Sequence, residues 1–96
     1  MIPSVSREAE LELADAASHY AREGSAELAA AFVDEFENAL NLLCQQPQLG
    51  APWRNQRRLP LRRFPFSVIY YVLGDSLRVI AIAHHRRAPH YWSDRK

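Results

Sequence analysis

The side chains best suited to chemistry gather in the second half of the chain. Residues 84–92 read His-His-Arg-Arg-Ala-Pro-His-Tyr-Trp, and an arginine pair at 62–63 precedes a strongly apolar stretch. Arginine forks bind phosphate or carboxylate oxygens and stabilise developing charge, while histidine or tyrosine can move a proton. The catalytic candidates are therefore Arg63, His84, His85, Arg86, Arg87 and Tyr91.

A structural explanation of the same residues stands beside the chemical one. Tyr91 and Trp92 can fold back to cap the core, and the arginines can pair with acidic residues of other elements. For Trp92 we expect the capping role. For Arg63, Arg86 and Arg87 we expect contact with a partner, because the basic residues of this half are nearly all arginine, whose fork suits such contacts.

Neither a metal nor an organic cofactor is expected. His84 and His85 are neighbours on a predicted strand and so point to opposite faces, and arginines stand between His85 and His90. The chain has a single cysteine, Cys44, and lacks both a Gly-rich phosphate loop and a Gly-x-Ser-x-Gly motif.

Charge is divided unevenly along the chain, although the net charge is only +1. Residues 1–50 hold two basic and nine acidic side chains, whereas residues 51–96 hold ten basic and two acidic ones. This asymmetry favours an anionic partner for the second half. The acidic side chains of the first half are expected to be solvated on the outer faces of helices rather than catalytic.

The length of 96 residues, 48% of them hydrophobic, predicts one domain, residues 1–96, with a single core. No apolar run approaches the ~20 residues that span a bilayer, so no membrane partner is expected. The lone cysteine and the lack of a signal-peptide pattern favour a cytoplasmic location.

Residues 6–46 predict an antiparallel pair of helices. Ser6 and Ser25 suit the N-cap position, Gly24 suits the end of the first helix, and Pro47 stops the second. Apolar residues recur at spacings of three and four in both segments. The clearest stripe comprises Leu28, Phe32, Phe36, Ala39, Leu40 and Leu43.

Three strands are predicted after a loop at residues 48–55. They span Arg57–Phe64, Phe66–Leu73 and Leu77–His84, with a tight Gly-Asp turn between the last two. Because Pro60 has no backbone N–H to donate, the first of these is expected to be an edge or bulged strand. Both alternating sets of Phe66–Leu73 are largely apolar, so this strand should be central and covered on both faces. In the last strand, Ala81 and Ala83 are expected to pack closely against helices.

The fold class that follows is α+β: an N-terminal helical hairpin packed on one face of a small antiparallel sheet of three to four strands. A fourth strand would come from Ile2–Val5, which Pro3 interrupts. Pro89–Lys96 is expected to form a short C-terminal tail or one helical turn.

Five stretches form a pattern over nearly the whole chain. They are Val-Ser-Arg-Glu-Ala-Glu-Leu-Glu-Leu at 5–13, Phe32 to Leu43 with Pro47 and Gly50, Arg-Arg-Phe-Pro-Phe-Ser-Val-Ile-Tyr-Tyr-Val at 62–72, Ala-Ile-Ala-His at 81–84, and Arg-Arg-x-Pro-x-Tyr-Trp at 86–92. In order and spacing the pattern resembles RelE/ParE-type toxins of bacterial type II toxin–antitoxin modules, particularly the branch of plasmid-stabilisation proteins.

The resemblance implies a growth-inhibiting toxin that a cognate antitoxin neutralises with an acidic, partly disordered segment. ParE-like members poison DNA gyrase and are not enzymes, and the Arg-Phe-Pro-Phe and Pro-x-Tyr-Trp segments look slightly closer to them. RelE-like members are ribosome-dependent messenger-RNA endonucleases, which is the alternative. The residues expected to bind the partner or the target are Arg57, Arg58, Arg62, Arg63, Arg86, Arg87 and Tyr91.

Two further hypotheses stay open. Relatives usually begin with a full strand, whereas this chain offers only Ile2–Val5, so a degenerate protein that retains only partner binding is one of them. The other is a plain nucleic-acid-binding module, because basic side chains bind phosphates and aromatic ones stack on bases.

Overall fold

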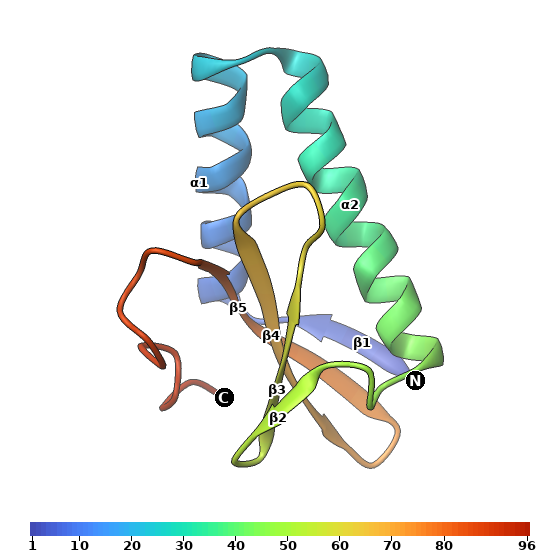
Figure 1. Ribbon diagram of the computed structural model, residues 1–96. Coiled ribbons are helices and arrows are strands. Elements are labelled where there is room, and N and C mark those ends of the chain that lie inside the picture. Colours follow the sequence, from blue (N-terminus) through green and yellow to red (C-terminus); the bar gives the residue numbers. More distant parts are fainter.

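The computed structural model describes all 96 residues as two helices and one five-stranded sheet (Figure 1). The strand order in the sheet is β1-β5-β4-β3-β2. The elements are β1 (Ile2–Val5), α1 (Arg7–Glu23), α2 (Ala26–Gln45), β2 (Ala51–Trp53), β3 (Gln56–Pro60), β4 (Phe66–Leu73) and β5 (Ser76–His84). Neither helix is long and apolar enough to cross a membrane.

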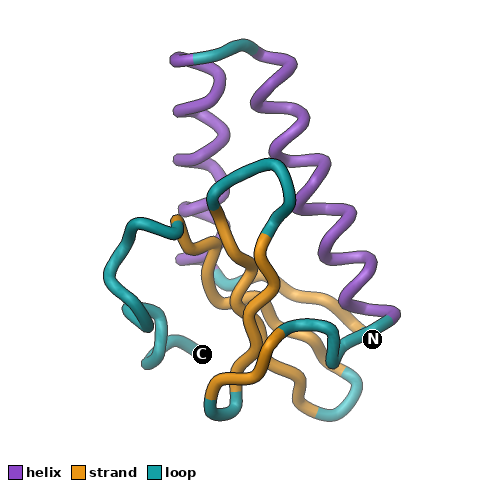
Figure 2. The backbone as a smooth tube through the Cα atoms, viewed as in Figure 1, coloured by secondary structure: helices purple, strands orange, loops and turns teal.

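The helical hairpin predicted for residues 6–46 is confirmed. The hydroxyls of Ser6 and Ser25 accept hydrogen bonds from the backbone N–H groups of Ala9 and Leu28, which satisfies helix N-termini that would otherwise lack partners. A short connection after Gly24 turns the chain back, so α1 and α2 lie side by side (Figure 2). Each such cap contributes about 1 kcal/mol to helix stability.

The sheet is larger than predicted, and it is mixed rather than antiparallel. β1 pairs in parallel with β5, and β2 falls inside the segment 48–55 that the sequence predicted as a loop. β1, the possible fourth strand of the prediction, and β2 are both short edge strands that contain a proline, Pro3 and Pro52. A proline is tolerated at an edge, because one side of an edge strand needs no hydrogen bonds.

Pro3 illustrates how the edge accommodates proline. Ile2 and Ser6 donate their N–H groups to carbonyls of Asp75 and Val79 in and beside β5. Because successive amides of a strand point to opposite sides, the nitrogen of Pro3 lies toward the free edge and no ladder bond is lost. The strand predicted at Arg57–Phe64 is β3, which ends earlier, at Pro60, and pairs with β2 only as far as Arg58.

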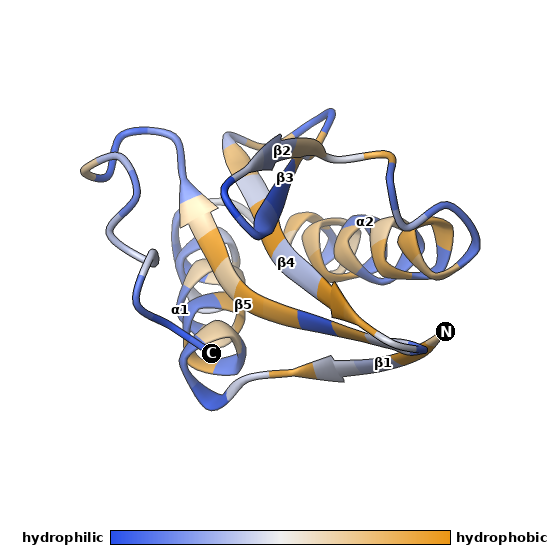
Figure 3. Cartoon of the chain, turned by 90° about the horizontal axis from the view of Figure 1, so that it is seen from below, coloured by the Kyte–Doolittle hydropathy of each residue, from blue (hydrophilic) through white to orange (hydrophobic).

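β4 is central and buried on both faces, as predicted. β4 and β5 form the middle of the sheet, and much of both strands is coloured as hydrophobic in Figure 3. On one face Phe66, Val68 and Tyr70 join a cluster with the helices, which includes Phe32 and Leu43. The two-residue turn at Gly74 and Asp75 that links β4 to β5 is also confirmed, with Gly74 at a φ of +61°.

The opposite face of the sheet carries a second, smaller cluster. It comprises Ile69, Ile80, Ala81, Ala83 and Trp92. The prediction that Ala81 and Ala83 pack against helices is therefore wrong: they make room for the indole of Trp92 instead. A register shift in the β4–β5 pairing passes over Ile80 and changes which residues of β5 face the helices.

Residues after β5 cross this second face as an irregular segment without a helix (Figure 2). We refer to residues 85–96 as the C-terminal segment. His90 has a φ of +61°, which a right-handed helix does not allow, and this explains why the alternative of a helical turn fails. Trp92 is only 5% exposed, so its predicted capping role is confirmed.

Candidate functional site

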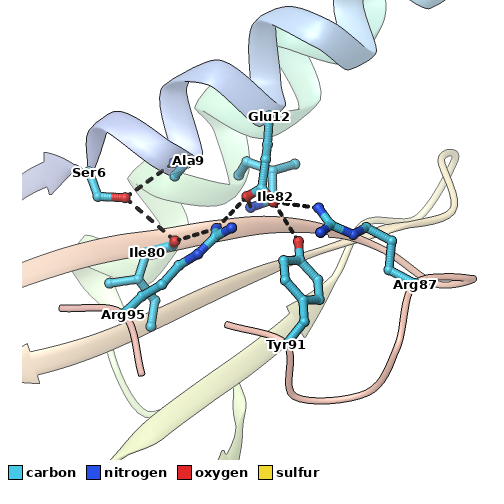
Figure 4. A network of polar contacts seen from close by, with 8 residues as sticks. All are labelled: Ser6, Ala9, Glu12, Ile80, Ile82, Arg87, Tyr91 and Arg95. Atoms are coloured by element: carbon cyan, nitrogen blue, oxygen red, sulfur yellow. Dashed lines mark hydrogen bonds and ion pairs between the residues drawn. The ribbon is translucent and has the colours of Figure 1, made fainter. Parts of the chain in front are cut away.

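One carboxylate, Glu12 in α1, organises the C-terminal segment (Figure 4). Its two oxygens accept hydrogen bonds from Arg87 Nη1 at 3.0 Å, Arg95 Nη1 at 2.8 Å and the hydroxyl of Tyr91 at 2.6 Å. They also accept one from the backbone N–H of Ile82 in β5 at 3.0 Å. The expectation that the helix acids are solvated is wrong for Glu12, whose side chain is 14% exposed.

Tyr91 is held as a hydrogen-bond donor. Burial, followed by the hydrogen bond and the negative charge of Glu12, raises the pKa of Tyr91 to about 12. The guanidinium carbon of Arg87 lies 3.6 Å from the centre of the Tyr91 ring, a cation–π contact. The phenol therefore stays protonated at neutral pH and cannot accept a proton there.

A second carboxylate, Glu35 in α2, holds the loop between β3 and β4. One of its oxygens accepts hydrogen bonds from the backbone N–H groups of Arg62 and Arg63, at 2.6 and 3.3 Å. The side chains of both arginines are exposed and form no ion pair. Glu35 thus fixes the loop backbone and leaves two guanidinium groups available to a partner.

A cleft of about 270 Å³ opens on the sheet face opposite the helices. Ser67 of β4 lies in it, 1% exposed, and accepts a hydrogen bond from Arg58 Nε at 3.0 Å. The same hydroxyl lies 3.0 Å from Nε2 of His85. The lining residues are Arg58, Ser67, Ile69, Ala83, His84, His85, Arg87, Ala88, Pro89, His90, Tyr91 and Trp92.

The other residues predicted for the site do not form one cluster. Arg57 donates to the backbone carbonyls of Gln48 and Gly50, whereas its neighbour Arg58 lines the cleft, as the alternation of a strand requires. Nδ1 of His84 accepts a hydrogen bond from the backbone N–H of Arg86. Burial, followed by the charge of Arg86, lowers the pKa of His84. The side chain of Arg86 itself is exposed and forms no ion pair.

The chain matches a known protein family over most of its length. The family described as the ParE toxin of the type II toxin-antitoxin system, parDE, matches residues 4–89. The chain belongs to the ParE toxin family. Among solved structures it is similar to the chromosomal ParDE TA system from P. aeruginosa, with 25% sequence identity and a TM-score of 0.77. That match covers 88% of this chain and 95% of the other. No curated protein matches the chain.

The ParE family match covers every candidate except Tyr91, which follows residue 89. The chain is thus a toxin of the ParE type, and the resemblance seen in the sequence is confirmed. No group of three or more His, Cys, Asp or Glu side chains is arranged to hold a metal ion.

Three residues of this ParE-family site were not singled out from the sequence: Glu12, Arg95 and Ser67. A signal for Glu12 existed, because it lies three residues after Ala9 and four before Ala16, on the side of α1 that is buried. A charge beside a buried stripe indicates a buried partner. Arg95 and Ser67 have no comparable signal, because Arg95 lies in a segment without helical or strand periodicity and Ser67 is a single serine within an apolar strand.

Proposed function

We propose that this ParE-family toxin inhibits growth by acting on DNA gyrase through an exposed basic surface at one end of the sheet. The surface is formed by the side chains of Arg62, Arg63 and Arg86. These three are the arginines of the predicted set whose side chains are exposed and form neither a hydrogen bond nor an ion pair within the protein; Arg58 is also exposed, but it is bonded to Ser67. The observation that carries the proposal is the family match, and the free arginines supply the contact residues.

The geometry of Tyr91 favours gyrase over the alternative of a ribosome-dependent messenger-RNA endonuclease. A nuclease of that kind needs groups free to transfer protons at the scissile phosphate. The hydroxyl of Tyr91 is bound to Glu12 and its pKa is raised to about 12, so it does not act as a base. Arg87, a second member of that catalytic set, is paired with the same carboxylate.

A cognate antitoxin is expected to cover the same basic surface with an acidic, partly disordered segment. Charge complementarity supports this, because residues 51–96 hold ten basic and two acidic side chains. An acidic segment bound to Arg62 and Arg63 would then compete with the target for the same guanidinium groups. Neutralisation follows from this competition, without a conformational change in the toxin.

The test is induced expression of the chain in bacteria without its antitoxin. Gyrase poisoning predicts slowed growth, an SOS response and stalled DNA replication, and purified toxin should inhibit supercoiling by gyrase. Arrest of translation before any SOS response would instead support the endonuclease. Unchanged growth together with normal supercoiling would reject both activities.

A matched pair of double variants tests the surface. Arg63→Gln with Arg86→Gln should relieve growth inhibition, whereas Arg7→Gln with Arg22→Gln makes the same charge change on α1 and should not. Equal relief by both pairs would show that total charge, and not this surface, determines toxicity.

A further inference from the structure

We propose that the cleft around Ser67 is a binding site for a single phosphate group. The site goes beyond the proposed function, since it does not depend on gyrase being the target. Its arginine and imidazole side chains come from β3 and from the C-terminal segment, and they include Arg58, His85, Arg87 and His90. No aspartate or glutamate lines the cleft. The lining therefore presents the charge of Arg58 and several hydrogen-bond donors without a carboxylate in the cleft, whereas the guanidinium group of Arg87 is already paired with Glu12 outside it.

Ser67 is the buried polar residue of the cleft, and it holds the exposed side chains of Arg58 and His85 in place. Its buried hydroxyl is bonded both to Arg58 Nε and to His85 Nε2, each at 3.0 Å. Holding Arg58 through Nε leaves both terminal nitrogens of the guanidinium without a partner in the protein. These two nitrogens form the fork that binds phosphate oxygens in parallel.

The same hydroxyl determines which nitrogen of His85 faces a ligand as a donor. Ser67 Oγ already accepts from Arg58, and its own hydrogen has no acceptor other than His85 Nε2. Because a buried hydroxyl is costly without a partner, the hydroxyl donates to Nε2, and a neutral imidazole then carries its proton on Nδ1. Nδ1 makes no hydrogen bond within the protein, so its N–H is available to a ligand.

The number and origin of the donors favour phosphate over carboxylate. The cleft offers the fork of Arg58, Nδ1 of His85 and the ring of His90, which stacks on Trp53 and makes no hydrogen bond. A phosphate group shares its negative charge over two or three non-bridging oxygens in a tetrahedral arrangement and can accept from several directions, whereas a carboxylate is planar. The volume of about 270 Å³ accommodates a phosphate with part of its ester, but not an extended ligand.

The test is a titration of the purified chain at constant ionic strength, followed by NMR of the Arg58 Nε–H and the His85 ring. Inorganic phosphate is the probe, and glutarate is the carboxylate control. Saturable shifts at both residues with phosphate, and binding at least tenfold weaker for glutarate, are expected. Absence of saturable shifts, or equal affinity for glutarate, would overturn the proposal.

Three variants distinguish phosphate binding at this specific site from nonspecific attraction to the positive charge of the protein. Arg58→Gln should weaken phosphate binding about tenfold, because a charge-assisted hydrogen-bond pair is lost. Ser67→Ala should weaken it about threefold by releasing Arg58 and His85, with the fold checked by circular dichroism. Arg7→Gln makes the same charge change outside the cleft and should leave affinity within about twofold. Equal weakening by Arg58→Gln and Arg7→Gln would reject the site, even if Ser67→Ala does not fold.

Two nucleotide probes identify the source of the phosphate. Thymidine 5′-phosphate carries a terminal phosphate, and the dinucleoside phosphate of two thymidines carries an internal diester. Tighter binding of the first assigns a terminal phosphate and tighter binding of the second assigns a nucleic-acid backbone. These measurements use no gyrase, so failure of phosphate binding leaves the growth and supercoiling results unaffected.

Discussion

Two basic segments of the molecule are each held by one helix carboxylate, but through different groups. Glu35 accepts from the backbone N–H groups of Arg62 and Arg63, so the loop is fixed while the guanidinium groups stay exposed. Glu12 accepts from the side chains of Arg87, Arg95 and Tyr91, so their polar groups are used to hold the C-terminal segment.

The difference shows that the type of a residue does not decide whether its charge is available. Arg63 and Arg87 are both exposed arginines in basic stretches, yet only Arg87 is paired with a carboxylate. What decides is the donor group that the carboxylate binds: a carboxylate that accepts from backbone N–H groups leaves the guanidinium charge free. The surface available to a partner is therefore smaller than the basic composition of the second half indicates.

The largest expected effect comes from removing the carboxylate that binds side chains. Glu12→Ala should lower the free energy of unfolding by about 3 kcal/mol, because two arginines, a phenol and the N–H of Ile82 lose their acceptor. Urea denaturation followed by circular dichroism measures the change. The control is Glu10→Ala on the same helix, which should cost less than about 1 kcal/mol. A similar loss of unfolding free energy in both variants would show that the contacts of Glu12 do not stabilise the fold.

Tyr91→Phe should lower the free energy of unfolding by about 1.5 kcal/mol near pH 8, because a short hydrogen bond to a carboxylate is lost. The folded-state pKa of Tyr91 is raised to about 12 from the usual 10.0, so the protonated phenol stabilises the fold fully below about pH 10. That contribution is lost as pH rises from 10 through 12. Urea denaturation at pH 8 and pH 11 should show the advantage of the wild type over Tyr91→Phe shrinking. An unchanged difference would contradict the raised pKa.

Glu35→Ala should cost only about 1 kcal/mol, since two exposed backbone hydrogen bonds are lost and no ion pair is broken. The effect should be local. Amide hydrogen exchange should accelerate at Arg62 and Arg63, while the N–H of Ile82, which is bound to Glu12, should stay protected. If Glu35→Ala destabilised the protein as much as Glu12→Ala, the contrast between the two carboxylates would not hold.

The smallest effect on stability is expected for a free arginine. Arg63→Ala should change the free energy of unfolding by less than about 0.5 kcal/mol while relieving growth inhibition. Arg95→Ala should instead cost about 1.5 kcal/mol, because Arg95 binds both Glu12 and the carbonyl of Ile80. Thermal unfolding and a growth assay of both variants test this directly. Equal stability losses would remove the distinction between free and held arginines.

Much of the fold could be predicted because its signals are local. The caps Ser6 and Ser25, the apolar stripe of α2 and the turn at Gly74 each act between residues a few positions apart. The two-sided burial of β4 also follows from its own sequence, since both alternating sets are largely apolar. The edge strand β2 escaped prediction, and β1 was expected only as an interrupted fourth strand, because each is short, contains a proline and is stabilised mainly by its neighbour.

The sequence predicted which residues belong to the candidate site, but not how they are arranged in space. The arginines, histidines and Tyr91 were recognised as a group, whereas the structure divides them between Glu12, the Ser67 cleft and the free surface. The role of Ser67 was invisible in the sequence, because a serine within an apolar strand carries no sign of what lies across the sheet. Its partners Arg58 and His85 are nine and eighteen residues away.

The sequence by itself therefore determined the helical hairpin, the central strand, the capping by Trp92 and the family. The tertiary structure alone decided which charges are paired and which remain free. The physical reason is range: helix periodicity, caps and turns arise from neighbours along the chain, whereas the bond from Arg95 to Glu12 joins residues 83 positions apart. Such a contact exists only after β1 and β5 have brought α1 beside the end of the chain.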